Sequence, residues 1–339
     1  MTKKTRVLVT GAGGFIGHHL VSFLRRQGYW IRGVDLKHPE FSPTKAHEFQ
    51  VLDLRRWEDC LRASKGVDEI YALAADMGGM GFISCNHAQI LHNNSLINIH
   101  TLEAARQNRV KRYLYTSSAC VYPDYRQTDI HCVPLKEEDA YPAEPQDAYG
   151  WEKLVTERLC RHYREDYGLE TRIVRFHNIF GPFGTWDGGR EKAPAALCRK
   201  TAIAKLVGDK EIEIWGDGEQ TRSFCYIDDC VTGLVKLMRS DYREPLNLGQ
   251  DRMVSINQLA DMIAGIAGVE LRRKHVAGPQ GVRGRNSDNT RLRQVLGWEP
   301  QISLEEGLAR TYSWIEDQVA TMLAQPRSPQ HMDAVVGAD

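Results

Sequence analysis

A glycine-rich turn near the N-terminus constrains the fold of this chain more than any other feature. The run 6–10 is short, apolar and β-branched, as in a buried strand, and Gly11, Gly14 and Gly17 follow it before a helical stretch at 18–27. Glycines at this spacing let the backbone turn tightly and approach a pyrophosphate, while the helix N-terminus faces the phosphate charge. The pattern therefore predicts strand, turn and helix, either as a plain structural turn or as the start of a dinucleotide site.

A carboxylate at the end of the next predicted strand favours the dinucleotide site. The run 30–34 ends at Asp35, which lies 18 residues beyond Gly17. This is close to the spacing at which a carboxylate binds the adenosine ribose hydroxyls. Because a carboxylate there repels a 2′-phosphate, NAD is favoured over NADP, while Lys37 and His38 nearby keep NADP as the alternative.

Alternation of strands with long helices indicates the architecture. Predicted strands at 68–75, 112–116 and 171–175 alternate with helical stretches at 88–108 and 147–166. This order is typical of an α/β fold with a Rossmann-type doubly wound parallel sheet, whose sites lie at the carboxyl ends of the strands.

A change of pattern after the last of these strands predicts a second, smaller α/β domain for substrate. The segment 184–192 is polar and glycine-rich. We predict an NAD-binding domain at 1–180 to which 225–250 returns, a substrate domain at 181–224 and 251–324, and a disordered tail at 325–339.

A tyrosine and a lysine one helical turn apart are the first candidates for chemistry. Tyr149 and Lys153 lie at i and i+4, so they share a helix face. The ammonium, with any second nearby cation, favours phenolate and brings a phenol pKa of ~10 toward neutral. Such a phenolate can take a proton from a sugar hydroxyl while a hydride leaves the same carbon. Taken alone, the pair also fits an ordinary amphipathic surface helix.

Three further segments are less decisive. Two of them allow both a structural and a functional interpretation, and the third is expected to be structural only. Asp53 and Leu54 follow a short strand and either cover the adenine or begin a helix as its N-cap. The glycine-rich loop 76–81 is either a flexible connection or a close backbone approach to a sugar. The acidic run 137–139 is expected to be a solvated loop.

Composition points to a small-molecule partner. Lys and Arg total 44 and Asp and Glu total 44, so neither nucleic acid nor a membrane surface is expected as partner. There is no signal sequence and no apolar run long enough to span a bilayer, which leads us to expect a cytoplasmic protein. The eight cysteines lack Cys-x-x-Cys spacing, so we expect reduced thiols, and the absence of His-Glu-x-x-His argues against a metal site.

Taken in order, the glycine turn, Ser118 and Tyr149-x-x-x-Lys153 resemble the extended short-chain dehydrogenase/reductases of the nucleotide-sugar epimerase and dehydratase type. The resemblance covers nearly everything up to the tail. Longer segments resemble more narrowly the GDP-mannose 3,5-epimerase family, namely 117–123, 142–150, 175–178, 188–194 and 281–288.

This resemblance implies a reaction. Tyr149, with Lys153 and Ser118, would remove the proton of the sugar's 4-hydroxyl as tightly bound NAD takes the hydride. The resulting ketone acidifies the hydrogens on carbons 3 and 5, and the family's base and acid on opposite ring faces match Cys120 and Lys192. Hydride return then regenerates NAD. GDP-D-mannose would become GDP-L-galactose, with GDP-L-gulose as the product of single inversion at carbon 5.

The proton transfers set a requirement on two pKa values. Reference values are ~8.5 for cysteine and ~10.4 for lysine, and both must move toward neutral for efficient transfer. Proximity of Lys192 favours the Cys120 thiolate, and burial lowers the lysine pKa. Outside these motifs Cys120 would read as a small buried thiol and Lys192 as a solvated charge.

The predicted binding residues fall into two sets. The cofactor set is Gly11, Gly14, Phe15, Ile16, Gly17, Asp35, Asp53, Leu54, Ala74, Tyr149 and Lys153. The substrate set is Gly78, Ser118, Ala119, Cys120, Tyr149, Asn178, Glu191, Lys192, Ala193, Lys200, Gln220, Arg222 and Arg285. Arg222 and Arg285 are candidate diphosphate clamps, with surface ion pairs as the alternative, and Arg283 is either structural or a second phosphate contact.

Competing functions stay open at this point. A nucleotide-sugar 4-epimerase needs no Cys120/Lys192 pair, and a 4,6-dehydratase is expected to carry carboxylates where Ala119 and Cys120 stand. A non-catalytic NAD sensor is expected to have lost part of the catalytic set, which is complete here. The resemblance also implies a homodimer formed through the helices at 88–108 and 147–166.

Overall fold

The central sheet has seven strands, all pairs parallel. The computed structural model describes residues 4–325. The sheet order is β11-β6-β5-β4-β1-β2-β3. Its strands are β1 (Arg6–Thr10), β2 (Trp30–Asp35), β3 (Glu48–Val51), β4 (Glu69–Ala72), β5 (Arg112–Ser118), β6 (Glu170–Phe176) and β11 (Pro245–Leu248). The order reverses between β1 and β4, which confirms the predicted Rossmann-type doubly wound fold and puts its switch point beside the glycine turn.

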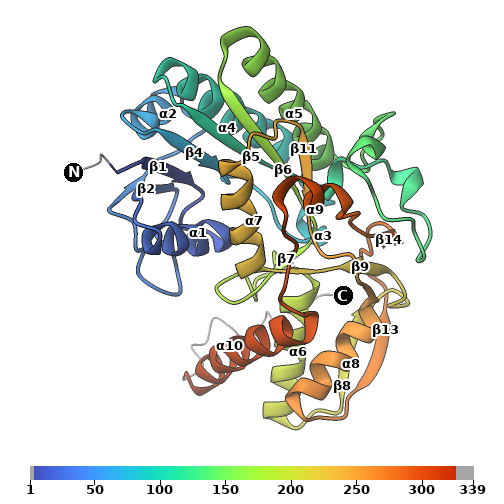
Figure 1. The fold of residues 1–339 in the computed structure, drawn as a ribbon. Coiled ribbons are helices and arrows are strands. Elements are labelled where there is room, and N and C mark those ends of the chain that lie inside the picture. Colours follow the sequence, from blue (N-terminus) through green and yellow to red (C-terminus); the bar gives the residue numbers. More distant parts are fainter. Residues whose placement is uncertain (1–3, 326–339) are drawn as a thin grey trace.

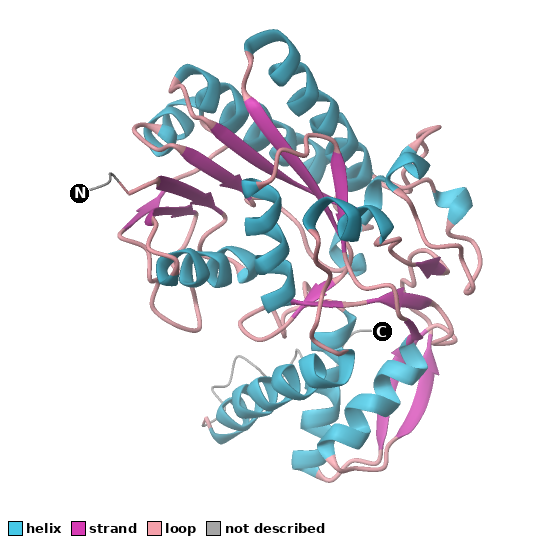
Figure 2. Ribbon diagram, in the orientation of Figure 1, coloured by secondary structure: helices cyan, strands magenta, loops and turns pink. Residues whose placement is uncertain are grey.

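Helices cover both faces of this sheet (Figures 1 and 2). One face carries α1 (Phe15–Arg26) and α7 (Ile227–Arg239), and the other carries α2 (Trp57–Ser64), α4 (His87–Gln107) and α5 (Ala148–Tyr167). Apolar side chains of α1 and α7 belong to one buried cluster, and those of α2, α4 and α5 to another. Both faces of the sheet are therefore buried, as strands with continuous apolar runs require.

A smaller group of elements lies at one end of the sheet (Figure 1). Its helices are α6 (Ala193–Val207), α8 (Ile256–Ala267) and α10 (Leu304–Ala324). Strands β8 (Glu211–Trp215) and β13 (Arg272–Val276) pair in parallel, and β9 (Thr221–Ser223) lies between β12 (Met253–Ser255) and β14 (Gly284–Arg285). The apolar cluster of α1 and α7 continues into these helices, so this group and the sheet share one core. The remaining elements are short: α3 (Met80–Ile83), β7 (Ile179–Phe180), β10 (Cys225–Tyr226), α9 (Thr290–Leu296) and three 3-10 turns at Ala119–Val121, Asp124–Arg126 and Glu137–Ala140.

The acidic run 137–139 is not the solvated loop that its composition predicts. It forms a 3-10 turn in which Glu137 is buried. The Glu137 carboxylate accepts a hydrogen bond from the Asn247 backbone amide at 3.0 Å and lies 3.4 Å from the Arg291 guanidinium. Burial nevertheless raises the pKa of Glu137. The returning strand β11 needs an acceptor here, which the local sequence does not reveal.

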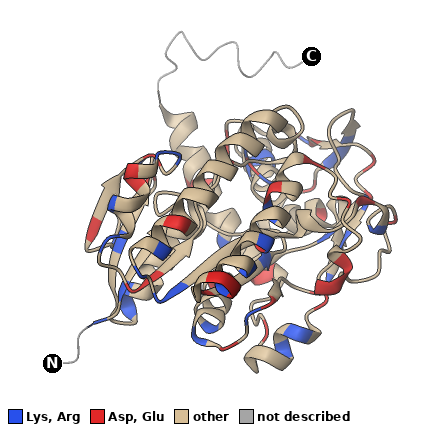
Figure 3. Cartoon of the chain, turned by 90° about the horizontal axis from the view of Figure 1, so that it is seen from above, with Lys and Arg blue, Asp and Glu red and all other residues tan. Residues whose placement is uncertain are grey.

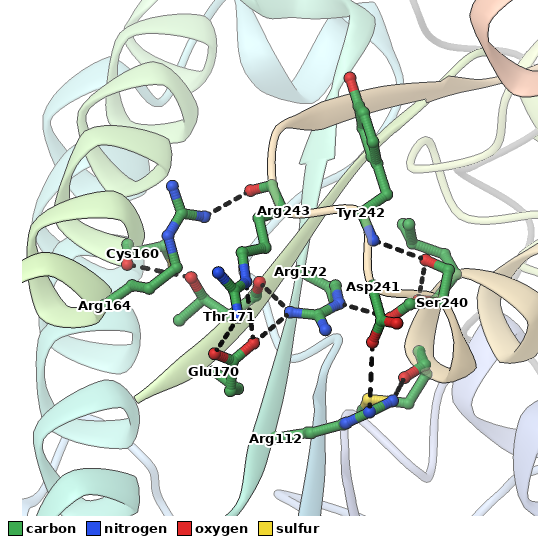
Figure 4. A network of polar contacts seen from close by, with 12 residues as sticks. Arg112, Cys160, Arg164, Glu170, Thr171, Arg172, Ser240, Asp241, Tyr242 and Arg243 are labelled. Carbon is green, nitrogen blue, oxygen red and sulfur yellow. Dashed lines mark hydrogen bonds and ion pairs between the residues drawn. The ribbon is translucent and has the colours of Figure 1, made fainter. Parts of the chain in front are cut away.

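An arginine-rich network ties the same returning segment down at the opposite end of the sheet (Figure 4). Glu170 accepts from the buried Arg172 at 3.0 Å and from Arg243 at 2.8 Å, and Arg172 also donates to the Ser240 carbonyl at 3.0 Å. Arg112 donates to the Met238 carbonyl at 2.6 Å. These bonds fasten the connection between α7 and β11 to β5 and β6, far from the carboxyl edge of the sheet.

Basic and acidic residues are interspersed through the fold (Figure 3). No described helix is long and apolar enough to cross a membrane. Within residues 4–325 no group of three or more His, Cys, Asp or Glu side chains is placed to hold a metal ion. The tail predicted to be disordered lies outside the described residues, apart from Gln325.

Candidate active site

The glycine turn packs as tightly as its spacing predicts. Gly11 has φ +68°, a conformation that favours glycine, and a Cβ on Gly17 would lie 2.1 Å from the Gly11 carbonyl oxygen. Helix α1 therefore begins directly at Phe15, three residues before the predicted start, with Gly14 as an N-cap that offers no side-chain acceptor. The amides of the first turn, including those of Phe15 and Ile16, are thus left for an anion at the positive end of the helix.

Asp35 is held against this turn. Its carboxylate accepts from the Gly13 amide at 2.9 Å and from the Leu36 amide at 2.6 Å. The two neighbouring cations that kept NADP open are engaged elsewhere: Lys37 lies 3.1 Å from the Glu40 carboxylate, and the His38 ring stacks on Phe49 with centroids 4.5 Å apart. The carboxylate is therefore the charge that faces the turn.

The end of β4 completes the cradle. β4 stops at Ala72, earlier than predicted, because the amides of Leu73 and Ala74 donate to the Thr10 hydroxyl at 3.0 and 3.1 Å. A Cβ on Gly11 would lie 3.0 Å from the Ala74 nitrogen, so Ala74 does adjoin the turn. Sequence reasoning missed Thr10, although a hydroxyl as the last residue before a glycine turn is a readable signal.

Asp53 does not begin the following helix. The N-cap of α2 is Arg56, and the Asp53 carboxylate accepts from the Arg55 guanidinium at 2.7 and 2.9 Å. The hydrogen bond from Arg55 is the main reason why the pKa of Asp53 is lowered. Leu54 is buried and its carbonyl accepts from the Cys60 thiol at 3.1 Å. A contact of Asp53 and Leu54 with adenine stays a prediction.

Helix α5 approaches the end of β5 very closely. Asp147 caps α5 by accepting from the Gly150 amide at 2.8 Å. A Cβ on Gly150 would lie 2.1 Å from the Cys120 carbonyl oxygen, so only glycine lets the helix come this near. Ser118 ends β5, and the Cys120 amide donates to its hydroxyl at 3.2 Å. The structure therefore brings Ser118, Cys120 and Tyr149 together from β5, the 3-10 turn Ala119–Val121 and α5.

Tyr149 does not have the lowered pKa that its spacing from Lys153 predicts. Burial raises the pKa of Tyr149 well above its usual value, the charges of Cys120 and Glu152 add to this, and a hydrogen bond with Ser118 opposes it. The Lys153 ammonium does lie 5.4 Å from the Tyr149 ring centroid, but it donates to the Thr116 carbonyl at 3.1 Å. Desolvation of the phenol therefore outweighs the ammonium in the protein alone.

Cys120 faces an arginine. The Arg285 guanidinium donates to the Cys120 sulfur at 3.3 Å and to the Gln127 side-chain oxygen at 2.5 Å. Ala119, beside Cys120, is buried. The sulfur of Cys120 is therefore held beside a permanently charged group.

Lys192 lies across from this pair, at the start of α6. It is the N-cap residue, but its side chain caps nothing, and Ala193 and Pro194 follow in the first turn. The residue as a whole is exposed to solvent, yet the protein atoms around its ammonium desolvate it and lower its pKa, which the charge of Cys120 opposes and that of Arg285 assists. The positive end of the helix also disfavours an ammonium. The shift is in the direction expected of a proton donor near neutral pH.

Among residues 4–325, the guanidinium groups of Arg222 and Arg285 bond to carbonyl, amide or sulfur acceptors rather than to carboxylates. Arg222 donates to the carbonyls of Val282 at 2.7 Å and Gln280 at 3.2 Å, and neither guanidinium takes part in an ion pair within the described part of the chain. Burial, followed by the charge of Arg285, lowers the pKa of Arg222 to about 9. The alternative of surface ion pairs is therefore wrong for these two, and an anion would relieve their repulsion.

Arg283 behaves differently. Both of its terminal nitrogens donate to the Asp217 carboxylate, at 2.9 and 3.0 Å, on the exposed surface. This favours the structural reading of Arg283 over a phosphate contact.

Two predicted substrate residues present unused acceptors. The Glu191 Oε2 and Gln220 Oε1 atoms are buried and have no hydrogen-bond partner among the described residues. The other oxygen of Glu191 accepts from Arg199 at 2.7 Å, and the Gln220 amide donates to the Trp215 carbonyl at 3.3 Å. Because buried acceptors are rarely left unpaired, both are suited to hydroxyl or N–H groups of a ligand.

The remaining predicted substrate residues have contacts of their own. Asn178 has φ +44°, which asparagine tolerates better than most residues, and it donates to the Ser223 carbonyl at 2.8 Å. Gly78 is buried, and a Cβ there would lie 2.9 Å from Phe82. Lys200 donates to the Glu213 carbonyl at 2.8 Å, with its ammonium 5.9 Å from the Trp215 ring centroid. Lys200 thus adjoins Trp215 rather than the cysteine.

One buried carboxylate escaped sequence reasoning. Glu152 would read as a surface helix residue, but its side chain is fully buried and accepts from Asn94 and Asn98 of α4, each at 2.9 Å. Its Oε1 lies 3.7 Å from the Lys153 ammonium. The available signal was the polar composition of 93–98, which is unusual for a helix that packs against another.

Comparison with known proteins defines the class. The chain belongs to the NAD dependent epimerase/dehydratase family, which it matches over residues 7–249. A solved UDP-glucose 4-epimerase of Thermotoga maritima, in complex with UDP-glucose, superposes with a TM-score of 0.82 at 26% identity, covering 93% of this chain and all of that one (100%). The cofactor of the family is NAD, which agrees with the cradle of Gly11, Gly17 and Asp35.

Within this family the chain is a member of the GDP-mannose 3,5-epimerase group. It is 54% identical to GDP-mannose 3,5-epimerase 1 of Oryza sativa subsp. japonica over 320 residues, which cover 94% of this chain and 83% of that protein. It is 52% identical to GDP-mannose 3,5-epimerase of Arabidopsis thaliana, with 94% and 84% covered.

Proposed function

We propose that this chain converts GDP-D-mannose to GDP-L-galactose by inverting carbons 3 and 5, with GDP-L-gulose as the product of single inversion at carbon 5. The observation that carries the proposal is the gathering of Cys120, Lys192 and Arg285 beside Tyr149 and Ser118. A base and an acid from different elements are what inversion at an acidified carbon requires.

The cofactor residues fit a tightly held NAD. The close packing of Gly11 and Gly17 leaves room for a pyrophosphate at the uncapped start of α1, and Asp35 suits ribose hydroxyls. Bound NAD would supply the acceptor for the hydride from carbon 4 and would be restored in each turnover. Binding residues are proposed as Gly11, Gly14, Phe15, Ile16, Gly17, Asp35, Asp53, Leu54, Ala74, Tyr149 and Lys153.

Tyr149, assisted by Ser118, transfers the proton of the sugar's 4-hydroxyl. Tyr149 takes this proton and later returns it, and Ser118 is hydrogen-bonded to the phenol at the end of β5. Because burial raises the pKa of Tyr149 in the protein alone, phenolate needs cations close by. Lys153 is one such cation, and it is fixed by a hydrogen bond to the Thr116 carbonyl at 3.1 Å.

Cys120 and Lys192 act on opposite faces of the sugar ring. Once carbon 4 is a ketone, Cys120 acts as the base that removes a proton from carbon 3 or carbon 5, while the Arg285 guanidinium donates to its sulfur at 3.3 Å. Lys192, whose pKa is lowered by desolvation, delivers a proton from the other face. The product is an inverted centre, and Cys120 must lose a proton to solvent and Lys192 regain one before the pair can invert the second carbon.

The remaining residues hold the sugar nucleotide. Arg222 and Arg285 provide unbalanced positive charge for the diphosphate, and the unused acceptors of Glu191 and Gln220 suit hydroxyl or base N–H groups. We propose the substrate set Gly78, Ser118, Ala119, Cys120, Tyr149, Asn178, Glu191, Lys192, Ala193, Lys200, Gln220, Arg222 and Arg285. GDP as the nucleotide rests on the similarity to the rice and Arabidopsis proteins.

Three further proposals concern organisation. Residues 1–180 with 225–250 bind the cofactor, and 181–224 with 251–324 bind the sugar nucleotide, which is supported by β11 joining the large sheet. A homodimer through α4 and α5 is supported by an exposed apolar stripe of Leu91 and Ile99 on α4 and Trp151 and Val155 on α5. A cytoplasmic location is supported by eight cysteines that are all free.

Product analysis tests the proposed function. The protein as isolated, without added NAD, is incubated with GDP-mannose, and the sugar products are identified by proton NMR. We expect signals of GDP-L-galactose and GDP-L-gulose. A 4-epimerase would instead interconvert UDP-glucose and UDP-galactose, so activity on that pair with none on GDP-mannose would refute the assignment. No turnover of either substrate would favour the NAD sensor.

A further inference from the structure

The segment 188–192 leads into α6 and carries Lys192. Its first two residues make few contacts. Gly188 and Gly189 have φ +86° and +81°, and no atom lies within 4 Å of a Cβ built on either. Their surroundings therefore do not fix the path of the chain. The carbonyl of Lys192 accepts from the Ala196 amide at 2.9 Å, so α6 holds Lys192 on one side and the two residues just before it hold it on the other.

Arg190 attaches this segment to the loop that follows β4. Its guanidinium lies 3.3 Å from the Asp76 carboxylate and 3.7 Å from the centroid of the Phe82 ring. Its carbonyl accepts from the Gly79 amide at 3.0 Å, and a Cβ on Gly79 would lie 2.5 Å from the Glu191 carbonyl oxygen. Side chain and backbone of Arg190 thus dock on the same short loop.

Asp76, the acceptor, is itself fixed. Its Oδ2 accepts from Gln89 and Asn93 of α4, each at 3.0 Å. Its backbone amide donates to the Asn94 side-chain oxygen at 2.6 Å, and its carbonyl accepts from the Asn94 amide at 3.1 Å. The loop therefore offers Arg190 a rigid partner.

The same network reaches the centre that acts on carbon 4. The Asn94 amide also donates to Glu152 at 2.9 Å, and Glu152 is fully buried next to Lys153 in α5. A continuous set of hydrogen bonds and ion pairs thus runs from Lys153 through Glu152, Asn94 and Asp76 to Arg190, two residues before Lys192. The residues that act on carbon 4 and the segment that carries Lys192 are therefore held by the same polar network.

On its other side the segment is tied to its own helix. Arg199 of α6 lies 2.7 Å from the Glu191 carboxylate and donates to the Trp186 carbonyl at 3.0 Å. These contacts fix the segment to α6 but not to Cys120, which lies on the sheet side. The Arg190 side chain instead joins this segment to Asp76 and Phe82, which follow strand β4 of the central sheet.

We propose that Arg190 is a positioning residue for the reaction proposed above: through Asp76 and Phe82 it sets the reach of Lys192 toward the ring face opposite Cys120. This inference rests on the proposed function. Without Arg190, Cys120 still removes a proton, exchanges it with solvent and returns it to the same face. The rate of inversion falls, because inversion needs Lys192 to deliver a proton to the opposite face.

The test separates exchange from inversion. Arg190→Ala and wild type, each as the isolated holoprotein, are incubated with GDP-mannose in deuterated water, and deuterium is measured by NMR in recovered GDP-mannose and in product. A misplacement of roughly 1 Å costs up to ~100-fold in rate. We therefore expect inversion to fall roughly 10- to 100-fold, with deuterium in recovered substrate falling much less and KM changing by less than about threefold.

Matched variants guard the interpretation. Asp76→Asn removes the partner and is expected to show the same rise in the ratio of exchange to inversion, with Arg190→Lys between it and wild type. Arg293→Ala breaks comparable exposed ion pairs, at 2.7 and 3.4 Å, away from the site and leaves the ratio unchanged.

Parallel loss of exchange and inversion in Arg190→Ala, or an unchanged ratio, overturns the inference while leaving the proposed function intact. Absence of deuterium from wild-type product instead refutes the proposed function itself.

Discussion

Replacing Gly150 by alanine tests how closely α5 must approach the cysteine. The new Cβ would lie 2.1 Å from the Cys120 carbonyl oxygen and 2.8 Å from the Cβ of Pro145. Contacts under 3.0 Å force a shift, so the helix and the Cys120 segment must separate by about 1 Å. The obstacle is a backbone carbonyl, which cannot rotate away as a flexible side chain would.

The expected effect is larger on turnover than on stability. Overpacking costs ~1–3 kcal/mol, and the better helix propensity of alanine offsets up to ~1 kcal/mol of that. A displacement of ~1 Å between catalytic groups costs ~100-fold in rate. We predict that kcat for GDP-mannose falls ~100-fold while the free energy of unfolding falls by ~1–2 kcal/mol.

A second helical glycine supplies the control. Gly265 lies in α8, and no atom is within 4 Å of a Cβ built there. Gly265→Ala should leave kcat unchanged and raise the free energy of unfolding in urea by up to ~1 kcal/mol. Equal kcat values for Gly150→Ala and Gly265→Ala would refute the argument from close approach.

Three other variants probe the cofactor cradle, the anion site and the core. Gly17→Ala puts a Cβ 2.1 Å from the Gly11 carbonyl oxygen and should yield protein without bound NAD, measured as nucleotide released on denaturation; retained NAD contradicts this reading. Arg222→Ala removes charged hydrogen bonds worth ~1.5–3 kcal/mol, so KM should rise roughly 10- to 100-fold with a smaller effect on kcat. Steady-state kinetics in which kcat falls more than KM rises would show that Arg222 does not mainly bind the substrate. His177 is buried, which lowers its pKa from 6.5 to about 3, so the unfolded state binds the extra proton and stability is full above pH 6.5 and declines as pH falls toward 3. This group contributes at most ~1.4 kcal/mol per pH unit, so His177→Gln should flatten the acid limb of urea-unfolding curves, and an unchanged slope would show that the ring is not desolvated as described.

Features encoded locally were predictable. The run 6–10 with the glycine turn became β1 and α1, and the helix expected at 88–108 is observed at His87–Gln107. Strand, turn and helix signals depend on neighbouring residues, and the alternation of elements restricts the topology to few choices. The candidate residues Ser118, Cys120 and Tyr149 come together because all lie at the carboxyl edge of such a sheet.

The features that were predicted wrongly or missed depend on contacts between residues far apart in sequence. The burial of Glu137 follows from the returning strand β11, more than 100 residues later, and that of Glu152 from asparagines on α4. The raised pKa of Tyr149 reflects desolvation, which a spacing rule cannot measure. Likewise nothing local indicates that Arg285 donates to the sulfur of Cys120.

Solvent deuterium incorporation tests the central claim most directly. Wild type, Cys120→Ala and the exposed-cysteine control Cys85→Ala are incubated with GDP-mannose in deuterated water without added NAD, and the products are examined by proton NMR. The account predicts deuterium at carbons 3 and 5 with new L-sugar signals for wild type and Cys85→Ala, and loss of both for Cys120→Ala. Inversion at carbon 4 without deuterium, or full activity of Cys120→Ala, would contradict it.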